Sequence, residues 1–423
     1  MKKTARLLLA LPLLCTGAAF AQAPADAPDS IVEMYGMGMP IFDNAKTQGA
    51  TFPAPADRPN QVPASAYTGV NDPARNRITV ATSHWGFRGY ERLGSPELRL
   101  VWQMESAFQI DQNTGPGIAA RDNKVGLRHA RLGEIFMGQW DTPYKYIGLP
   151  INPIRAGYVF NQTGIIGNPG FGVPGTTTQF TSGAGKSDAA FDRRQGNSVQ
   201  YWSPVWGGFS FRLMHSVNEG KRQVAAGGPV VNPVVNAASV QWDRGTLSLR
   251  YAYEEHRDYF GMSQLGGAAA ATATNQGSKD KGHKFVLLWL IGNTRITGAV
   301  ERLDYQTDDT VAGNVSRYKR TAWYAVLEQR FGKNAVWVSY GRADDGSCGR
   351  VGGLACSTRA LGADYLTLGY IYRFSRRTEV FAMYYRLNNK DSAQYSPSPT
   401  VSGAIVAPGA DTIAYGFGII HFF

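Results

Sequence analysis

The sequence predicts an all-β protein, a 16-stranded antiparallel transmembrane β-barrel. Three observations predict it: strands that alternate large apolar residues with small or polar ones, an even number of such strands, and connections that are alternately short and long. The alternation is clearest in residues 411–423, where Tyr415, Phe417, Ile419 and Phe423 share one face. A large apolar face at the end of the chain suits lipid, and pairing of this strand with the first would close the barrel. We therefore assign these four residues to barrel closure and assembly.

The strands follow one another as a single strand, a series of hairpins and a final single strand. The first is expected at 31–41, followed by a proline-rich loop from 42 to about 76. The last is 411–423. Each hairpin has a tight turn rich in Gly, Asn, Ser or Pro, and a longer polar loop separates it from the next. The seven hairpins pair 84–91 with 97–110, 121–129 with 134–140, 197–202 with 208–217, 236–242 with 246–256, 282–291 with 294–306, 318–330 with 335–342, and 364–374 with 378–387.

The N-terminus indicates export. Residues 1–21 have a basic start, a short apolar run and Ala19-Phe20-Ala21, which is typical of a cleavable signal peptide. Residues 22–423 would then form the barrel domain. The apolar run is too short to span a bilayer, and no stretch of 18 apolar residues occurs elsewhere in the sequence.

Charge is spread thinly along the chain. The formal net charge is +11, and +8 once the three basic residues of the signal peptide are removed. No run of five basic residues occurs, which disfavours nucleic-acid binding and favours charges spread through a solvated interior and loops. Cys348 and Cys356 lie eight residues apart in a glycine-rich segment of an exported chain, which predicts a loop disulfide rather than a metal site.

Several segments match a known family in order along the chain. They are SIVEMYGMGM (30–39), SHWGFRGYERLGSPELRLVWQMESAF (83–108), RDNKVGLRHARLGEIFMGQWDTP (121–143), NSVQYWSPVWGGFSF (197–211) and the terminal YGFGIIHFF. With them the chain resembles the general porins of Gram-negative outer membranes, particularly the β-proteobacterial type. The resemblance implies a homotrimer of 16-stranded barrels with the first strands at the trimer axis. It also implies that the third long loop, 141–192, folds inward and narrows the pore.

The resemblance also places the pore constriction. Carried over by position, the basic wall would consist of Arg88 and His84, Arg121, and Arg194. His84 stands where the family usually has arginine, so its charge would appear only near its usual pKa of about 6.5. The opposing loop carries the basic Lys145, Arg155 and Lys186, whereas Asp188 is its only acid between 142 and 190. Basic walls that face so few carboxylates predict a preference for anions.

Other signals favour no enzyme. The segment Gly183 to Ser187 ends like a phosphate-binding loop, but Phe180 stands where that motif needs glycine. A barrel enzyme would need a lipid-facing serine with a histidine nearby, and Ser83 and His84, as neighbours, point to opposite faces. The acidic pairs Asp308-Asp309 and Asp344-Asp345 are expected at solvated loop tips, with divalent cations shared with lipopolysaccharide as an alternative.

The sequence therefore predicts a passive outer-membrane diffusion channel for small hydrophilic solutes and ions, with anions preferred. The alternatives are a substrate-specific channel and, more remotely, an outer-membrane barrel enzyme. We expect no cofactor, no metal and no nucleic acid. The expected partners are two further copies of the chain, outer-membrane lipid and lipopolysaccharide, small anions, and the outer-membrane assembly machinery.

Overall fold

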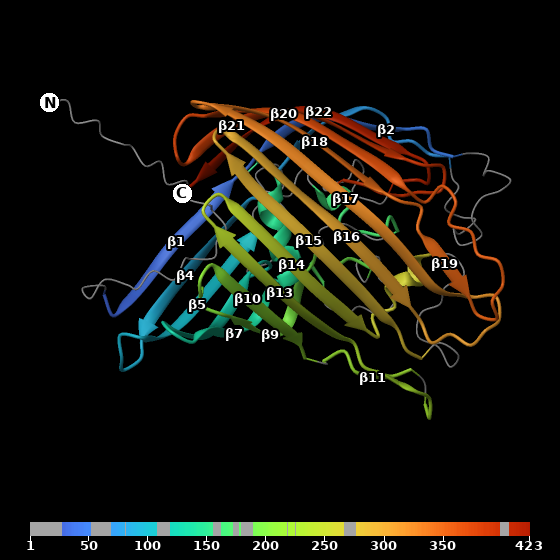
Figure 1. Cartoon of the computed structure of the whole chain (residues 1–423), viewed down its shortest axis with the longest axis horizontal. Coiled ribbons are helices and arrows are strands. Elements are labelled where there is room, and N and C mark those ends of the chain that lie inside the picture. Colours follow the sequence, from blue (N-terminus) through green and yellow to red (C-terminus); the bar gives the residue numbers. More distant parts are fainter. Residues whose placement is uncertain are drawn as a thin grey trace.

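The computed structural model describes residues 28–51, 69–80, 82–107, 119–154, 162–171, 177–178, 189–217, 219–224, 226–265, 276–397 and 406–423. Over these residues the chain forms a closed antiparallel sheet with short connections at one end and long connections at the other (Figure 1). Sixteen strands form its wall, which confirms the predicted fold class. The expected signal peptide, residues 1–21, lies outside the described residues.

The first two strands of the wall are each interrupted once. β1 (Ser30–Gly38) and β2 (Ile41–Gln48) form the first, and β3 (Arg75–Thr79) and β4 (His84–Arg92) form the second. The others are β5 (Leu98–Ala107), β6 (Asn123–His129), β7 (Gly133–Asp141), β9 (Arg194–Trp202), β10 (Phe209–Ser216), β13 (Val234–Arg244), β14 (Leu247–Arg257), β15 (Lys279–Ile291), β16 (Thr294–Gln306), β17 (Val315–Phe331), β18 (Asn334–Ala343), β20 (Ala363–Arg373), β21 (Thr378–Asn389) and β22 (Asp411–Phe422).

The last strand closes the barrel against the first. β22 pairs with β21 on one side and with both β2 and β1 on the other. At the very end, the backbone of Phe423 exchanges two hydrogen bonds of 3.1 Å with Gly36. Tyr415 and Phe417 are each 61% exposed on the outer face, with Ile419 at 40% and Phe423 at 47%. These side chains therefore meet lipid, while the closure itself is made by the backbone.

The first long loop is shorter than the sequence suggested. The chain continues as a strand from Ile41 to Gln48, where a loop was expected, and returns at Arg75. Pro40, which has no backbone N–H, marks the break between the two halves. Asn44, Lys46 and Gln48 give this segment a loop-like composition. Its inward residues are nevertheless buried, and Arg77 on β3 forms an ion pair with the fully buried Asp43 at 2.7 Å.

Glycines permit the tightest turns at the end with short connections. Gly245 and Gly292 have φ values of +59° and +58°, in the left-handed region that glycine adopts without a steric penalty. Each joins two strands whose residues pair up to the turn: β13 with β14, and β15 with β16.

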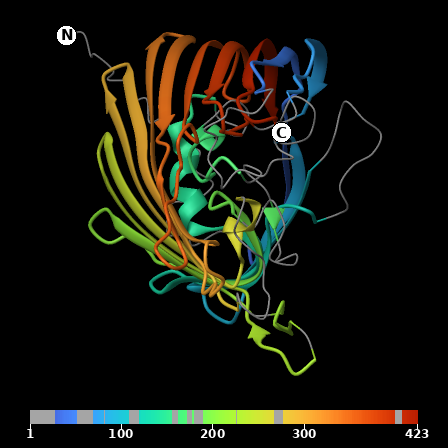
Figure 2. The same ribbon diagram turned by 90° about the vertical axis from the view of Figure 1, so that its right-hand side faces the viewer.

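Short elements lie on or inside the wall. β8 (Thr177–Thr178) pairs parallel with β9, β11 (Arg222–Gln223) pairs with β12 (Val230–Val231), and β19 (Ser347–Arg350) extends the β17–β18 hairpin. The helix α1 (Pro143–Gly148) and the 3₁₀ turns η2 (Leu149–Ile151) and η3 (Gln162–Gly164) follow β7 inside the barrel (Figure 2). A fourth 3₁₀ turn, η4 (Gly261–Gln264), follows β14. No helix among the described residues is long and apolar enough to cross a membrane.

The inward loop packs on the barrel wall through an apolar core. Its buried residues include Tyr144, Ile151, Ile165 and Phe191, and they contact inward residues of β14 to β21. On the opposite side, the inward side chains of β3, β4 and β5 include the polar Arg77, His84 and Glu105. The loop thus lies against one side of the barrel, and the remaining cross-section faces a charged wall.

Candidate functional site: the barrel lumen

Two of the predicted wall residues meet at one carboxylate. Glu105 on β5 is 6% exposed, and its Oε1 accepts a hydrogen bond from Nε of Arg121 at 2.7 Å. Nε2 of His84 lies 3.9 Å from Oε2 of the same group, which also accepts a bond from the Tyr35 hydroxyl at 2.9 Å. Glu105 was not expected from the sequence as part of this wall. The negative charge of Glu105 offsets the positive charge of Arg121.

Arg194 is also matched by carboxylates. It is 5% exposed, with Nε bonded to Oδ1 of Asp122 and Nη2 3.4 Å from Oδ1 of Asp141. Asp141 in turn pairs with Lys145 at 2.7 Å, at the start of the inserted loop. Burial raises the pKa of Asp122 to about 6, against the attraction of the Arg194 guanidinium.

Arg88 lies on the same face of β4 as His84 but belongs to a separate contact. Its Nε donates to Oε2 of Glu33 at 2.9 Å, and its guanidinium lies 4.7 Å from the centre of the Tyr35 ring. The structure therefore brings His84 and Arg121 together on Glu105, places Arg194 beside Asp122 and Asp141, and links Arg88 to them through Tyr35. Arg155 and Asp188, the other two predicted constriction residues, lie outside the described residues.

A buried polar pair on the wall fixes the inserted loop. Glu301 on β16 is 1% exposed, and its carboxylate accepts hydrogen bonds from the Tyr144 hydroxyl at 2.7 Å and from the backbone N–H of Gly167 at 2.7 Å and 2.8 Å. Arg320 on β17 bonds Glu301 at 2.9 Å and the Ile165 carbonyl at 2.7 Å. We call Glu301 and Arg320 the loop anchor. It holds two segments of the loop that are more than twenty residues apart.

Further bonds hold the ends of the loop. Lys284 on β15 donates to Oδ1 of Asp192 at 2.6 Å, and the Tyr305 hydroxyl donates to the Ala189 carbonyl at 2.6 Å. Near the turn η2, Thr297 donates to the Ile151 carbonyl at 2.6 Å, and Arg295 to the Asn152 carbonyl at 3.3 Å. The described parts of the loop are thus buried and hydrogen-bonded to the wall.

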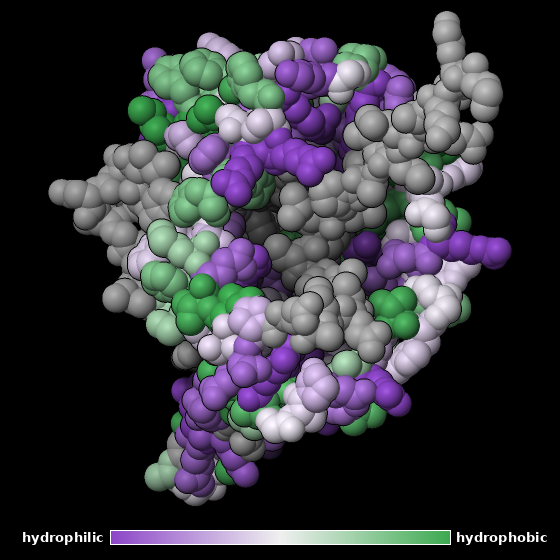
Figure 3. Space-filling view, turned by 90° about the vertical axis from the view of Figure 1, so that its left-hand side faces the viewer, coloured by the Kyte–Doolittle hydropathy of each residue, from purple (hydrophilic) through white to green (hydrophobic). Residues whose placement is uncertain are grey.

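Arginines gather on the inner wall near the short turns, a feature that the sequence reasoning missed. Each lies on a different strand, within a few residues of a short turn. Its neighbours along the strand point outward, so its own side chain points into the lumen. Figure 3 looks onto this end and shows hydrophilic residues around a central hollow. We call the set the lower arginine ring: Arg99, Arg128, Arg212, Arg250, Arg295, Arg330 and Arg373.

Fewer carboxylates face the lumen at that level among the described residues. Glu328, fully buried, lies within 2.6 Å of Arg330, 3.1 Å of Arg295 and 3.6 Å of Arg373. Three more acids pair with arginines of this ring: Glu134, Asp243 and Glu379 lie 2.6 Å from Arg128, 4.0 Å from Arg250 and 3.0 Å from Arg373. Arginine therefore outnumbers carboxylate here. The sequence did contain a signal for this ring, because each of these arginines occupies an inward-facing strand position close to a short turn.

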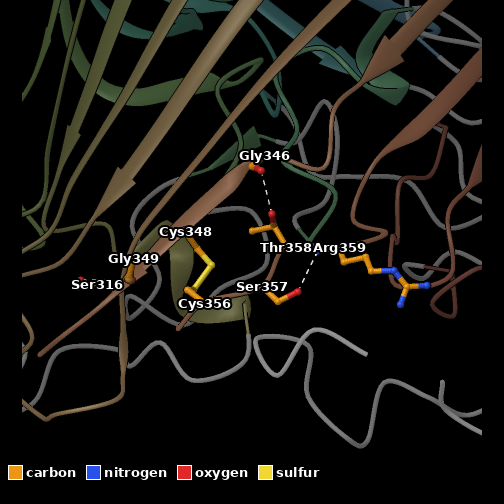
Figure 4. Close-up of a disulfide and its surroundings, with 8 residues drawn as sticks. All are labelled: Ser316, Gly346, Cys348, Gly349, Cys356, Ser357, Thr358 and Arg359. Atoms are coloured by element: carbon orange, nitrogen blue, oxygen red, sulfur yellow. Dashed lines mark hydrogen bonds between the residues drawn. A yellow bond between two sulfur atoms is a disulfide. The ribbon is translucent and has the colours of Figure 1, made fainter. Parts of the chain in front are cut away.

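The loop cysteines lie among the long connections, where β19 pairs with the start of β17. Cys348 on β19 and Cys356 form a disulfide with their Cα atoms 5.7 Å apart (Figure 4). Beside it, the Thr358 hydroxyl donates to the Gly346 carbonyl at 2.8 Å. The bridge holds together the loop that follows β18.

The serine–histidine neighbours make no catalytic pair. The Ser83 hydroxyl is buried and donates to the Val80 carbonyl at 2.6 Å, whereas Nδ1 of His84 lies 2.8 Å from the Thr82 carbonyl. The described residues instead line a lumen that carries fixed charges. Such a lumen sets conductance, size limit and ion preference.

Comparison with known proteins agrees with this geometry. A model of the Gram-negative porin family matches residues 7–392. Outer membrane porin protein 32 of Delftia acidovorans is 23% identical over 314 residues, which cover 74% of this chain and 76% of that protein.

Solved structures show the same fold. The anion-selective porin of Comamonas acidovorans superposes with a TM-score of 0.65 at 18% identity, over 93% of this chain and all of that one. OmpT of Vibrio cholerae gives 0.57 at 12% identity, over 94% and 99% of the two chains. Since the family model spans nearly the whole sequence and the barrel is closed, the chain belongs to the Gram-negative porins, channels of the outer membrane.

Proposed function

We propose that this porin is a trimeric, passive diffusion channel that prefers small hydrophilic anions. The lower arginine ring is the observation that carries the preference. An ion must pass this ring in a water-filled lumen with low-dielectric walls, where fixed charges bias which ions enter. The surplus of arginine over carboxylate lowers the free energy of an anion there and raises that of a cation.

The predicted wall contributes less to this preference than its arginines suggest. Arg88, Arg121 and Arg194 each lie beside a carboxylate, so their charges are largely balanced. We assign His84, Arg88, Arg121 and Arg194 to the constriction, where they set a transverse field. Asp188 and Arg155 would complete it from the loop side.

Two further points support the proposal. The structural neighbour from Comamonas acidovorans is named as anion-selective. The trimer rests on the resemblance of the sequence to general porins, with the first strands at the axis. Delivery by the outer-membrane assembly machinery would use the terminal strand, whose Tyr415, Phe417, Ile419 and Phe423 face outward.

Ion preference is tested by reversal potential in a salt gradient across a planar bilayer. The informative variant combines Arg99→Gln with Arg128→Gln. Arg99 stacks over the Tyr90 ring, 4.3 Å from its centre. Neutralising Arg128 leaves Glu134 with a partner, because Glu134 also forms an ion pair with Lys124 at 2.5 Å. A unit charge about 8 Å from the ion path in water is worth about 0.5 kcal/mol, or about twofold in permeability ratio.

We expect wild type to favour anions and the double variant to lose about fourfold of that preference, because two unit charges act together. The matched control is Arg244→Gln with Lys333→Gln, which removes two charges from the exposed turns. A wild-type channel that prefers cations contradicts the proposal. An unchanged ratio in the double variant shows that the lower arginine ring does not set it.

A further inference from the structure

The disulfide lies one wall residue away from the inserted loop. Cys348 on β19 pairs in register with Tyr318 on β17, and Tyr318 is fully buried with its side chain inside the barrel. There the Tyr318 ring meets Phe171 of the inserted loop edge to face, with the ring centres 5.5 Å apart. A single side chain of the wall therefore connects the loop that carries the disulfide to the loop that narrows the lumen.

The backbone of the disulfide loop packs directly on the Tyr318 ring. Gly346 has a φ of +75°, and a Cβ placed on it would lie 3.0 Å from Cε2 of Tyr318. The hydroxyl of Thr358, two residues after Cys356, donates to the Gly346 carbonyl at 2.8 Å (Figure 4). The bridge and this hydrogen bond together hold both ends of the loop beside Tyr318.

A second long loop, the one that follows β21, is fastened to the disulfide loop. Oδ1 of Asp345 accepts hydrogen bonds from Nζ of Lys390 at 2.7 Å and from the backbone N–H of Gly362 at 2.9 Å. The backbone N–H groups of Lys390 and Ser392 donate to the carbonyls of Gly362 and Ala360, both at 3.0 Å. The disulfide loop thus supports the start of the loop that follows β21.

This second loop also reaches the inserted loop. Tyr395 is fully buried, and a Cβ placed on Gly170 would lie 2.6 Å from Cε2 of its ring. The guanidinium of Arg320, part of the loop anchor, lies 5.9 Å from the centre of the same ring. Gly170 and Phe171 are therefore in contact with two tyrosines that the long loops hold in place. We call Tyr318 and Tyr395 the outer clamp.

From these contacts we propose that the disulfide between Cys348 and Cys356 positions the inserted loop through the outer clamp, and so helps to set the open cross-section of the channel. Closely packed rings transmit a displacement, because there is little free space around them. The cross-link removes conformations that the disulfide loop would otherwise adopt. The loop anchor binds residues 165–168, and the outer clamp binds residues 170 and 171. The inference rests on the barrel being a channel and not on its ion preference.

The test records single channels of the folded wild-type porin in a planar bilayer before and after dithiothreitol is added. Dithiothreitol breaks the S–S bond to give two thiols and is itself oxidised to a cyclic disulfide, so reoxidation should reverse the effect. For a bridge between residues eight positions apart, chain entropy gives a factor of about 70. We expect the fraction of time spent outside the main conductance level to rise by up to that factor. The variant Cys348→Ser with Cys356→Ser should behave like the reduced wild type.

Two controls separate the outer clamp from a general loosening of the long loops. Glu219→Gln weakens the hydrogen bond from Asn197 in the loop that follows β10, and its currents should stay within about twofold of wild type. The double serine variant should not respond to dithiothreitol, because it has no bridge to reduce. All recordings use equal salt on both sides, so the proposed ion preference does not enter the result.

A contact variant shows whether the disulfide acts through the outer clamp. Phe171→Ala with Tyr395→Ala keeps the bridge but removes the contacts with the inserted loop, so dithiothreitol should change its currents less than about twofold. Heat-modifiable electrophoretic migration shows that each barrel is folded. If the double variant does not fold, each single variant should respond less than wild type. Unchanged currents in the reduced wild type overturn the proposal, as does a full response to dithiothreitol in the contact variant.

Discussion

Single carboxylates decide how much charge the constriction presents. The wall has the arginines that the family resemblance implies, yet Glu105 lies against Arg121 and Asp122 against Arg194. A buried charge pair is kept by mutual attraction and hydrogen bonds, and removing one partner leaves the other uncompensated. Neutralising the arginine of such a pair and neutralising its carboxylate should therefore shift the anion/cation preference in opposite directions.

This balance predicts the outcome of a double-mutant cycle at Glu105 and Arg121. Arg121→Gln should lower the anion/cation permeability ratio about twofold, because it removes one positive charge beside the ion path. Glu105→Gln should raise the ratio by a similar factor, and the double variant should return close to wild type. Reversal potentials in a KCl gradient measure all four proteins. If Glu105→Gln also lowers the ratio, the carboxylate does not face the permeating ion.

At the scale of elements, the inserted loop behaves as part of the wall. One carboxylate, that of Glu301, receives bonds from Tyr144 and from Gly167, while Arg320 bonds the carbonyls of Ile165 and Asn168. The loop anchor thus fixes how far the loop projects into the lumen. The open cross-section of the channel depends on this anchor as much as on the residues that line it.

The variant Glu301→Gln tests the loop anchor. It keeps the size of the side chain but removes the charge that Arg320 pairs with, and breaking a buried ion pair costs about 3–5 kcal/mol. We expect the loop to leave the wall for part of the time, so that single-channel current becomes noisier and its mean changes. Tyr144→Phe removes one hydrogen bond, worth about 1 kcal/mol, and should have a much smaller effect. Quiet wild-type currents from folded Glu301→Gln would show that the apolar core alone fixes the loop.

The sequence predicted the barrel well and its interior only partly. Period-two alternation identifies outward Met104 and inward Glu105 from local sequence alone, since each strand obeys it independently. The loop anchor depends on residues 157 and 134 positions apart, and no local pattern encodes such a contact. The strand from Ile41 to Gln48 was missed because its outward residues after Phe42 are polar.

At the scale of the whole molecule, charge and apolar surface are distributed in layers. Arginine surplus faces the lumen at the short-turn end, aromatic and aliphatic residues face lipid, and basic residues face outward near the long loops. The outer face is apolar on both sides of the barrel: Phe87 on β4 is 39% exposed and Val300 on β16 is 53% exposed. The two positions nevertheless have different expected neighbours, since β4 belongs to the trimer axis of general porins and β16 to the lipid-facing wall.

Arginine at these two positions separates a subunit contact from a lipid contact. Both residues lie five or six positions from a short turn, so the cost of facing the bilayer, about 2–4 kcal/mol at midplane, is similar for the two variants. Phe87→Arg also places three like charges around the trimer axis, and it should give folded monomers. Val300→Arg should remain trimeric. Native mass spectrometry gives the oligomeric state, and heat-modifiable electrophoretic migration shows that each barrel is folded. If Val300→Arg splits the trimer and Phe87→Arg does not, the subunits meet through the wall that contains β16 and not through the wall that contains β4.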